Sequence, residues 1–323
     1  MPVSPVSSIS PSSSFPSSAL SRRALIAAAC LAAQRSVRAS AQPTLLPHLP
    51  SIGLGTCCDE AERVQEQVTL ALSQGYRLID TASHYPGEEA IGAALDAAEA
   101  SGVVARSEVT VCTKVWFDDM GYEAALSSAV RSMRRLRTEQ LDLLLIHFPG
   151  TIDAVQEPKR NRKLREETWR ALERLQADGR VLKIGVSNWT SRHLRETLAS
   201  CQVTPQVLQT EVHPRLQQEA LVADAMAAGM EVMAFCPLAH GSPRLLQDPV
   251  VRQIAAARGR SSAQVLLRWS MQHGLVPIPK STSLVRLREN IGAMNFELSA
   301  AEMASLDGLE ANDRCSFDPR NIA

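Results

Sequence analysis

Short apolar runs and helix-period segments alternate along this chain from Ile52 onward, and no other feature constrains the fold as strongly. The first helix face shows apolar residues at the spacing i, i+4, i+7 and i+8, namely Val64, Val68, Ala71 and Leu72. We count about eight strand–helix units over roughly 260 residues, which is what a single (β/α)8 TIM barrel requires. The predicted fold class is therefore α/β, with one barrel domain over residues 44–323.

A doubly wound sheet is the alternative fold for such an alternation. That fold needs a glycine-rich phosphate-binding turn after its first strand. Gly53-Leu54-Gly55 is too short for that turn and lacks a third glycine. The barrel is therefore preferred. No internal repeat or linker divides residues 44–323, which indicates a single domain.

The individual elements follow from the same periodicity. Residues 52–56 are expected to form a short strand or turn, and the next strand ends at Asp80. The later strands span residues 109–115, 141–147, 183–188, 207–212, 231–237 and 275–278. Helices are expected over residues 88–100, 165–177, 218–228, 249–257 and 261–269. Leu126, Val130 and Met133 are expected to form the buried stripe of a further helix, and residues 149–165 an irregular segment. Ser261 and Ser299, each followed three residues later by Gln or Glu, predict N-terminal capping boxes.

Residues 1–43 have the composition of a targeting segment. Ser and Pro are frequent, acidic residues are absent, and arginines precede small apolar residues, which is typical of a transit peptide. The Ser and Pro content favours the chloroplast stroma over the mitochondrion. Arg22-Arg23 and the cleavage-like Ala39-Ser40-Ala41 leave a lumenal signal open. A disordered cytoplasmic tail is the remaining alternative.

Charge and cysteine spacing exclude several kinds of partner. Lys plus Arg and Asp plus Glu both number 34, so the basic face that nucleic-acid binding needs is not indicated. The apolar run at residues 24–33 is too short to span a membrane. The 7 cysteines show no spacing typical of a metal site, so no metal is expected. Cys57 and Cys58 are the one adjacent pair suited to redox chemistry.

Four polar residues stand at or just after consecutive strand ends: Asp80, Tyr85, Lys114 and His147. Because the carboxyl ends of barrel strands share one face, these side chains are expected to converge. A tyrosine is a weak acid with a pKa of about 10, and a neighbouring ammonium held by a carboxylate lowers that pKa. With an imidazole to bind the oxygen, the set can protonate a carbonyl while a hydride reaches its carbon.

The chain resembles the aldo-keto reductases from about Leu46 to its C-terminus. The resemblance rests on the motifs Gly53-x-Gly55-Thr56, Asp80-Thr-Ala-x-x-Tyr85, Lys114-x-Trp116, His147-x-Pro149, Gly185-Val-Ser-Asn188, Gln209-x-Glu211-x-His213-Pro214, Pro237-Leu238 and Ile278-Pro-Lys280-Ser281. It implies that the four strand-end residues form the catalytic tetrad of that family, with Tyr85 as the general acid.

The same resemblance implies NADPH or NADP+ as the cofactor. The residues implied at the nicotinamide end are Ser187, Asn188, Gln209 and Phe235, with Pro237 and Leu238 in the same site. The residues implied at the 2′-phosphate and adenine are Lys280, Ser281, Arg286, Glu289 and Asn290. Lys280, Arg286 and Arg288 also cluster after the last strand, where barrels of this type often bind a phosphate. The cations favour NADPH over NADH.

The resemblance further implies a carbonyl pocket lined by Trp116, Phe117, Phe148 and His147. Residues 151–162 and 313–323 are implied as loops over that pocket, where substrate choice is usually set. The chain departs from residues frequent in the family at Cys57, Gly87, Phe148 and Phe235. These departures spare the tetrad, and Cys57 and Phe148 change the pocket wall. The short C-terminal tail resembles that of members with small substrates.

The expected function is NADPH-dependent reduction of aldehydes or ketones to alcohols by a monomeric oxidoreductase of the NADP-dependent alcohol dehydrogenase type. Hydride would pass from nicotinamide C4, with Tyr85 giving the proton. One alternative is a cofactor-binding regulatory subunit without significant turnover, like the potassium-channel β subunits that resemble this family. Another is a metal-dependent barrel hydrolase, for which only His147 and His213 stand near suitable positions.

Overall fold

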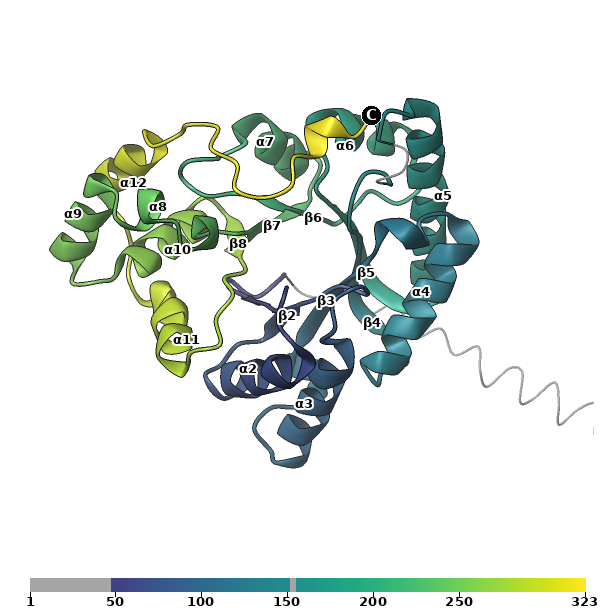
Figure 1. Ribbon diagram of the computed structural model, residues 1–323, viewed down its shortest axis with the longest axis horizontal. Helices are drawn as coiled ribbons and strands as arrows, with labels where there is room; N and C mark the ends of the chain where they lie inside the picture. Colours follow the sequence, from purple (N-terminus) through teal and green to yellow (C-terminus); the bar gives the residue numbers. More distant parts are fainter. Residues whose placement is uncertain (1–47, 152–154) are drawn as a thin grey trace, which may run out of the picture. The chain divides into compact units, whose positions relative to one another are not determined.

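The computed structural model describes residues 48–151 and 155–323. Within them, eight parallel strands pair in sequence order around a central axis, with the helices outside (Figure 1). The predicted (β/α)8 barrel is therefore confirmed. The predicted targeting segment at residues 1–43 lies outside the described residues and stays a prediction.

Each strand is short and pairs with the next strand in parallel. The strands are β1 (Leu54–Gly55), β2 (Leu78–Asp80), β3 (Thr110–Val115), β4 (Leu141–Ile146), β5 (Val181–Ser187), β6 (Val207–Glu211), β7 (Glu231–Phe235) and β8 (Leu275–Pro277). Backbone hydrogen bonds close the ring, because Gly53 N donates to Pro277 O at 3.0 Å and Gly55 N donates to Pro279 O at 3.1 Å.

The helices follow the strands in alternation. They are α2 (Ala61–Ser73), α3 (Glu88–Ala100), α4 (Tyr122–Arg135), α5 (Pro158–Ala177), α6 (Ser191–Ser200), α7 (Glu219–Ala227), α8 (Pro243–Leu246), α9 (Pro249–Arg258), α10 (Ser262–Gln272), α11 (Leu284–Ile291) and α12 (Ala300–Asp307). Short 3-10 turns are η1 (Arg106–Glu108), η2 (Phe117–Asp119), η4 (Ala239–Gly241), η5 (Gly292–Asn295) and η6 (Pro319–Asn321). The capping boxes predicted at Ser261 and Ser299 are both present.

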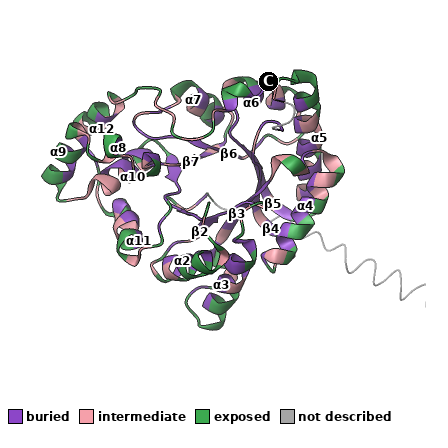
Figure 2. Ribbon diagram, viewed as in Figure 1, coloured by how far each residue is buried: buried purple, intermediate pink, exposed green. Residues whose placement is uncertain are grey.

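Two apolar layers hold the barrel together. Inside the ring of strands a small cluster packs around Leu143, Leu145 and Met233. Between strands and helices lies a much larger cluster, to which α2 contributes the predicted face that includes Val64 and Val68. Figure 2 shows this division as buried strands and helices that are buried on one side only. Since strand side chains alternate between these layers, nearly every strand position is buried.

The structure corrects two predicted elements. Helix α5 begins at Pro158, well before the predicted start at residue 165, so much of the segment expected to be irregular is helical. Its first turns carry the ion pairs Arg162–Glu166 and Lys163–Glu167, which support a polar helix at i,i+4 spacing. In α4 the predicted stripe is wrong at Val130, which is 47% exposed.

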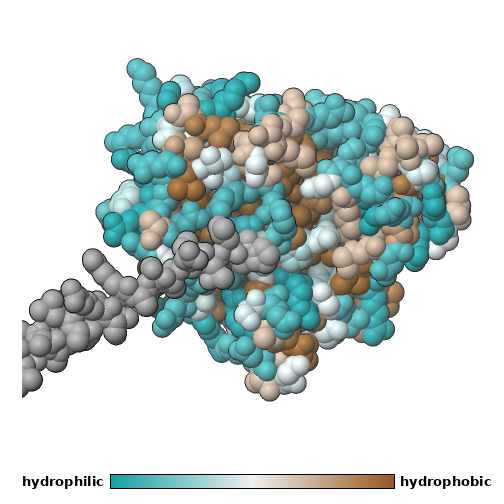
Figure 3. Space-filling model, turned by 180° about the vertical axis from the view of Figure 1, so that it is seen from behind, coloured by the Kyte–Doolittle hydropathy of each residue, from teal (hydrophilic) through white to brown (hydrophobic). Residues whose placement is uncertain are grey.

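The surface is typical of a folded domain with scattered apolar residues. On the face seen in Figure 3, hydrophilic residues predominate and hydrophobic residues form separate patches. Among the described residues, no helix has both the length and the apolar character needed to cross a membrane.

Candidate active site

The four predicted catalytic side chains meet at the carboxyl ends of β2, β3 and β4. Lys114 Nζ donates to both carboxylate oxygens of Asp80 at 2.8 Å and to the carbonyl oxygen of Thr81 at 2.7 Å. The same ammonium lies 5.6 Å from the centre of the Tyr85 ring. The Tyr85 hydroxyl lies 3.5 Å from His147 Nε2. The Lys114 ammonium thus donates its hydrogen bonds to Asp80 and Thr81 and lies next to the Tyr85 ring. The Tyr85 hydroxyl points at the imidazole.

Burial and charge set the protonation states of this group. The Asp80 carboxylate raises the pKa of Lys114 even though burial acts to lower it, so the ammonium stays charged. Burial raises the pKa of Tyr85 above its ordinary value of 10.0, and Lys114 only opposes part of that rise. The lowering of the Tyr85 pKa expected from the neighbouring ammonium is present, but burial has the larger effect. Tyr85 is held as a protonated hydroxyl, the form that donates a proton.

His147 is a neutral ring at the base of the pocket. Burial lowers the pKa of His147 well below 6.5, and the charge of Lys114 acts in the same direction. Its backbone carbonyl accepts a hydrogen bond from Asn188 Nδ2 at 3.0 Å. Asn188 has a left-handed backbone with φ of 63°, a conformation that asparagine tolerates better than most residues. This contact ties the end of β5 to the end of β4.

Aromatic rings form one wall beside His147. Phe148 stacks on His147 with ring centres 4.5 Å apart, and Trp116 meets His147 edge-on at 4.9 Å. Phe117 lies against Trp116 at 4.5 Å, so the predicted pocket aromatics are brought together. Phe317, from the C-terminal tail, packs edge-on against Phe148 at 5.0 Å. An aromatic cluster therefore surrounds the His147 ring that faces the tyrosine hydroxyl.

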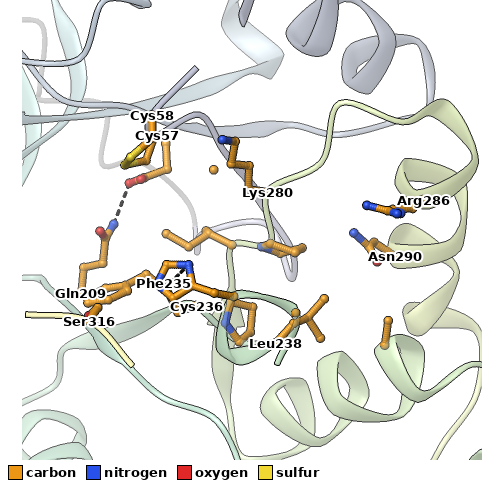
Figure 4. Close-up of a pocket in the computed structure, with 18 of the residues that line it drawn as sticks. Cys57, Cys58, Gln209, Phe235, Cys236, Leu238, Lys280, Arg286, Asn290 and Ser316 are labelled. Atoms are coloured by element: carbon orange, nitrogen blue, oxygen red, sulfur yellow. Dashed lines mark hydrogen bonds between the residues drawn. A yellow bond between two sulfur atoms is a disulfide. The ribbon is translucent and has the colours of Figure 1, made fainter. Parts of the chain in front are cut away.

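A cavity of about 950 Å³ extends from this group towards α11. Figure 4 shows Gln209 and the paired cysteines at one end of the cavity and Arg286 and Asn290 at the other. The predicted residues that line it are Asp80, Tyr85, His147, Phe148, Asn188, Gln209, Phe235, Pro237, Leu238, Lys280, Arg286, Glu289 and Asn290. Those that do not line it are Lys114, Trp116, Phe117, Ser187 and Ser281. Lys114 and Ser187 are fully buried behind the cavity wall.

The cavity's chemistry fits a nicotinamide dinucleotide. Near the tetrad it offers the amides of Asn188 and Gln209, and the latter donates to Asp80 Oδ1 at 2.6 Å. Beyond them it offers two cations, Lys280 along the cavity and Arg286 at the far end (Figure 4). A cavity of this size with amides at one end and cations beyond them suits an elongated anionic ligand.

Two features of the cationic end differ from the expectation. Lys280 Nζ pairs with Asp59 Oδ2 at 2.9 Å, so this cation already has an anionic partner. Arg288 belongs to the predicted cluster but donates from Nε to Gln74 Oε1 at 2.7 Å, outside the cavity. Of the three cations predicted to cluster, Lys280 and Arg286 line the cavity and Arg288 does not.

Sequence reasoning missed several residues around the cavity. Cys57 and Cys58 were anticipated, as a candidate redox pair and, for Cys57, as part of the pocket wall, and they form a disulfide beside the Gln209 end (Figure 4). His84 stacks on Trp116 with ring centres 4.3 Å apart. Phe317 lies in the tail that was expected to cover the pocket, and an aromatic residue there was the available signal. Cys236 and His240, also in the lining, are four residues apart, and that spacing alone was not read as a site.

Comparison with known proteins agrees with this geometry. The Aldo/keto reductase family model matches residues 51–311. Glyoxal reductase from Bacillus subtilis (strain 168) is 40% identical over 275 residues, which cover 85% of this chain and 94% of that protein. The chain therefore belongs to the aldo-keto reductase family.

Solved structures place the fold in the same family. An aldo-keto reductase enzyme from a Medee basin deep-sea metagenome library has a TM-score of 0.79 and 30% identity, over 86% of this chain and 97% of its own. The Bombyx mori aldo-keto reductase, solved in complex with NADP, has a TM-score of 0.76 and 31% identity, over 83% and 92%. The family is one of oxidoreductases that use nicotinamide cofactors and act on small carbonyl compounds.

Proposed function

We propose that this protein is an NADPH-dependent reductase of aldehydes and reactive ketones. The observation that carries the proposal is the convergence of Tyr85, Lys114, Asp80 and His147 at one end of a cavity that is also lined by two cations. The first group can protonate a carbonyl oxygen, and the cations can hold a phosphate.

Each tetrad residue has a distinct part in the proposed reaction. The carbonyl oxygen would lie between the Tyr85 hydroxyl and the neutral His147 ring, which holds it in place. Bound NADPH would supply a hydride from nicotinamide C4 to the carbonyl carbon. Tyr85 then gives its proton to the oxygen, and Lys114, fixed by Asp80, stabilises the phenolate that remains.

The preference for NADPH rests on the cationic end of the cavity. Lys280 and Arg286 would bind the 2′-phosphate, with Ser281 beside them, while Glu289 and Asn290 would contact the adenine. Asn188, Gln209 and Ser187 would hold the carboxamide, and Phe235 would stack on the nicotinamide ring. Pro237 and Leu238 line the cavity between the two ends.

The deciding experiment compares the wild-type protein with Tyr85→Phe. Turnover is followed as NADPH oxidation with glyoxal, methylglyoxal and 4-nitrobenzaldehyde. Loss of the proton donor should lower kcat by about 10²- to 10⁴-fold, the range for general acid catalysis, while NADPH binding persists. Tyr122→Phe, which removes a hydroxyl on α4 away from the cavity, is the matched control and should retain full activity.

The same experiment separates the proposal from its alternative. Tight NADPH binding without turnover on any carbonyl would favour a regulatory subunit. Turnover that survives in Tyr85→Phe within a few-fold would contradict the assigned proton donor.

We also propose that residues 1–43 direct the protein to the chloroplast stroma, on the composition of that segment. A fusion of residues 1–43 to a fluorescent protein should co-localise with stromal markers and be shortened on import. Mitochondrial or diffuse cytoplasmic fluorescence would reject this proposal.

A further inference from the structure

Three side chains with metal-binding chemistry meet at the rim of the cavity, apart from the tetrad. Cys236 directly follows β7, and His240 lies in η4, between β7 and α8. Cys315 lies in the C-terminal tail. Their ligand atoms all lie within 4.8 Å of one another. The chain thus brings a residue remote in sequence, Cys315, next to two neighbours in one loop.

The distances in this group suit one tetrahedral ion. Two ligands of a tetrahedral Zn²⁺ ion are separated by about 3.6 Å for a thiolate and an imidazole and about 3.8 Å for two thiolates, from the usual bond lengths. His240 Nε2 lies 3.3 Å from Cys236 Sγ. This separation is within a few tenths of an ångström of the thiolate–imidazole value, and the ligand atom of Cys315 lies within 4.8 Å of both.

Cys315 Sγ has a weak contact with His213 Nε2, at 3.9 Å, which a bound ion would replace. Cys236 and Cys315 are free thiols. Both ring nitrogens of His240 lie towards Cys236 Sγ, at 3.3 and 3.8 Å. His240 and Cys315 are exposed, so an ion can enter from solvent. Two thiols and an imidazole are the donor set preferred by Zn²⁺ and similar soft cations.

A second group shares Cys315 but is already satisfied by the protein. Glu211 and His213 also lie within 4.8 Å of that thiol. However, Glu211 Oε1 accepts from Cys315 N at 2.7 Å, and Glu211 Oε2 accepts from Ser316 N at 3.1 Å and Ser316 Oγ at 2.7 Å. This carboxylate anchors the tail, so the open ligand set is the one formed with Cys236 and His240.

We propose that Cys236, His240 and Cys315 bind a thiophilic divalent cation of the zinc class, with a water molecule as the fourth ligand. This revises the sequence-based expectation that the protein has no metal site. A bound ion would link the loop after β7 to the tail, whose Ser316 and Phe317 line the cavity. Binding would therefore hold the tail closed and slow the exchange of ligands.

The test is titration of the reduced, full-length protein with Co²⁺, whose visible absorption reports tetrahedral thiolate ligation, followed by displacement with Zn²⁺. One equivalent should bind. Cys236→Ser and Cys315→Ser should each weaken binding by more than the roughly 10- to 100-fold that loss of an outer-sphere partner causes. Cys201→Ser, which removes a free thiol at the end of α6, and the double change Cys57→Ser/Cys58→Ser should leave the spectrum intact.

A further pair of variants separates the two overlapping groups. His240→Ala should abolish the thiolate–cobalt spectrum, and His213→Gln should preserve it. The proposal is overturned if no thiolate-ligated cobalt forms, if His213→Gln abolishes the spectrum while His240→Ala does not, or if the Cys57 and Cys58 double variant removes it. These readouts do not depend on reductase turnover.

Discussion

Asp80 is the carboxylate that fixes two other side chains of the site, Lys114 and Gln209. It accepts two hydrogen bonds from Lys114 and one from Gln209, and it is 5% exposed. Its carboxylate keeps the Lys114 ammonium charged inside the barrel. Because both partners are buried, removing one leaves the other charge without compensation.

Asp80→Asn should therefore destabilise the fold by about 3–5 kcal/mol, the range for breaking a buried ion pair. Denaturant unfolding of the variant measures this free energy. Asp96→Asn removes a carboxylate from an ion pair in which both partners are 55% exposed, and it should change stability by at most about 1 kcal/mol. Equal effects of the two substitutions would contradict the structural importance of the buried pair.

Arg286→Ala tests the cationic end of the cavity. Loss of a charge-assisted hydrogen bond to the 2′-phosphate should raise the KM for NADPH by about 10- to 100-fold. The KM for NADH should hardly change, since NADH lacks that phosphate. Arg288→Ala is the matched control on the same helix, because Arg288 bonds to Gln74 outside the cavity. Equal changes for both cofactors would show that Arg286 does not read the phosphate.

At the residue scale, the sequence predicts which side chains at strand ends lie together. It does not predict contacts that depend on the conformation of loops. Asp80, Lys114 and His147 each close an apolar strand, so parallel pairing alone brings them together. The pairing of Lys280 with Asp59 depends on the conformation of the loop after β1, which no periodicity encodes. The net pKa direction of Tyr85 likewise depends on burial, which is a property of the folded molecule.

Among the elements, α4 and α5 show where periodicity succeeds and where it fails. The buried face of α4 is built from Ala125, Ser128, Ala129, Ser132 and Met133. Small residues let this helix pack closely, and a search for large apolar residues finds Val130 on the wrong side. The start of α5 was missed because its first turns face solvent and carry charge instead of an apolar stripe.

Strand β5 supplies the prediction for an element. A Cβ atom on Gly185 would clash with the Val207 carbonyl oxygen on β6 and lie 2.7 Å from Leu145 Cδ2 on β4. Gly185→Ala should destabilise the protein by about 1–3 kcal/mol through overpacking. Gly308→Ala is the control, since its Cβ would be no closer than 3.4 Å to its neighbours, and it should be neutral or stabilising by under about 1 kcal/mol. Thermal unfolding compares them, and an unaffected Gly185→Ala would contradict the close strand packing.

On the scale of the whole molecule, the barrel order follows from sequence because each unit pairs with the next. The path of the C-terminal tail does not, because it is fixed by single polar contacts. Arg192 Nη2 donates to Ile322 O at 2.8 Å, and His193 Nε2 lies 3.2 Å from the same oxygen. Thus α6 holds the end of the tail that covers the pocket.

The burial of His193 predicts a pH dependence of the free energy of unfolding. Burial lowers the pKa of His193 from 6.5 to about 3, and the charges of Arg165 and Arg192 add to the effect. Between these values the unfolded chain binds the proton and the native protein does not, so stability is full above pH 6.5 and falls on acidification. His193→Gln should make the unfolding free energy less dependent on pH. Between about pH 4 and 6 its slope should fall by up to about 1.4 kcal/mol per pH unit.

The measurement is the unfolding free energy of wild type and His193→Gln across that range. If the unfolding free energies of the two proteins changed equally with pH, His193 would have the same pKa in the folded and unfolded states. That result would contradict the prediction. A variant with lower stability at neutral pH but a flatter acid limb would agree with it.

The ion pair between Lys280 and Asp59 also governs how cofactor affinity responds to ionic strength. On the proposed function, a phosphate that binds Lys280 takes the place of the Asp59 carboxylate. One anion is exchanged for another at this lysine, so no salt counter-ion is released from it. A weak salt dependence of NADPH affinity would then reflect this exchange of anions and not a lack of ionic contacts.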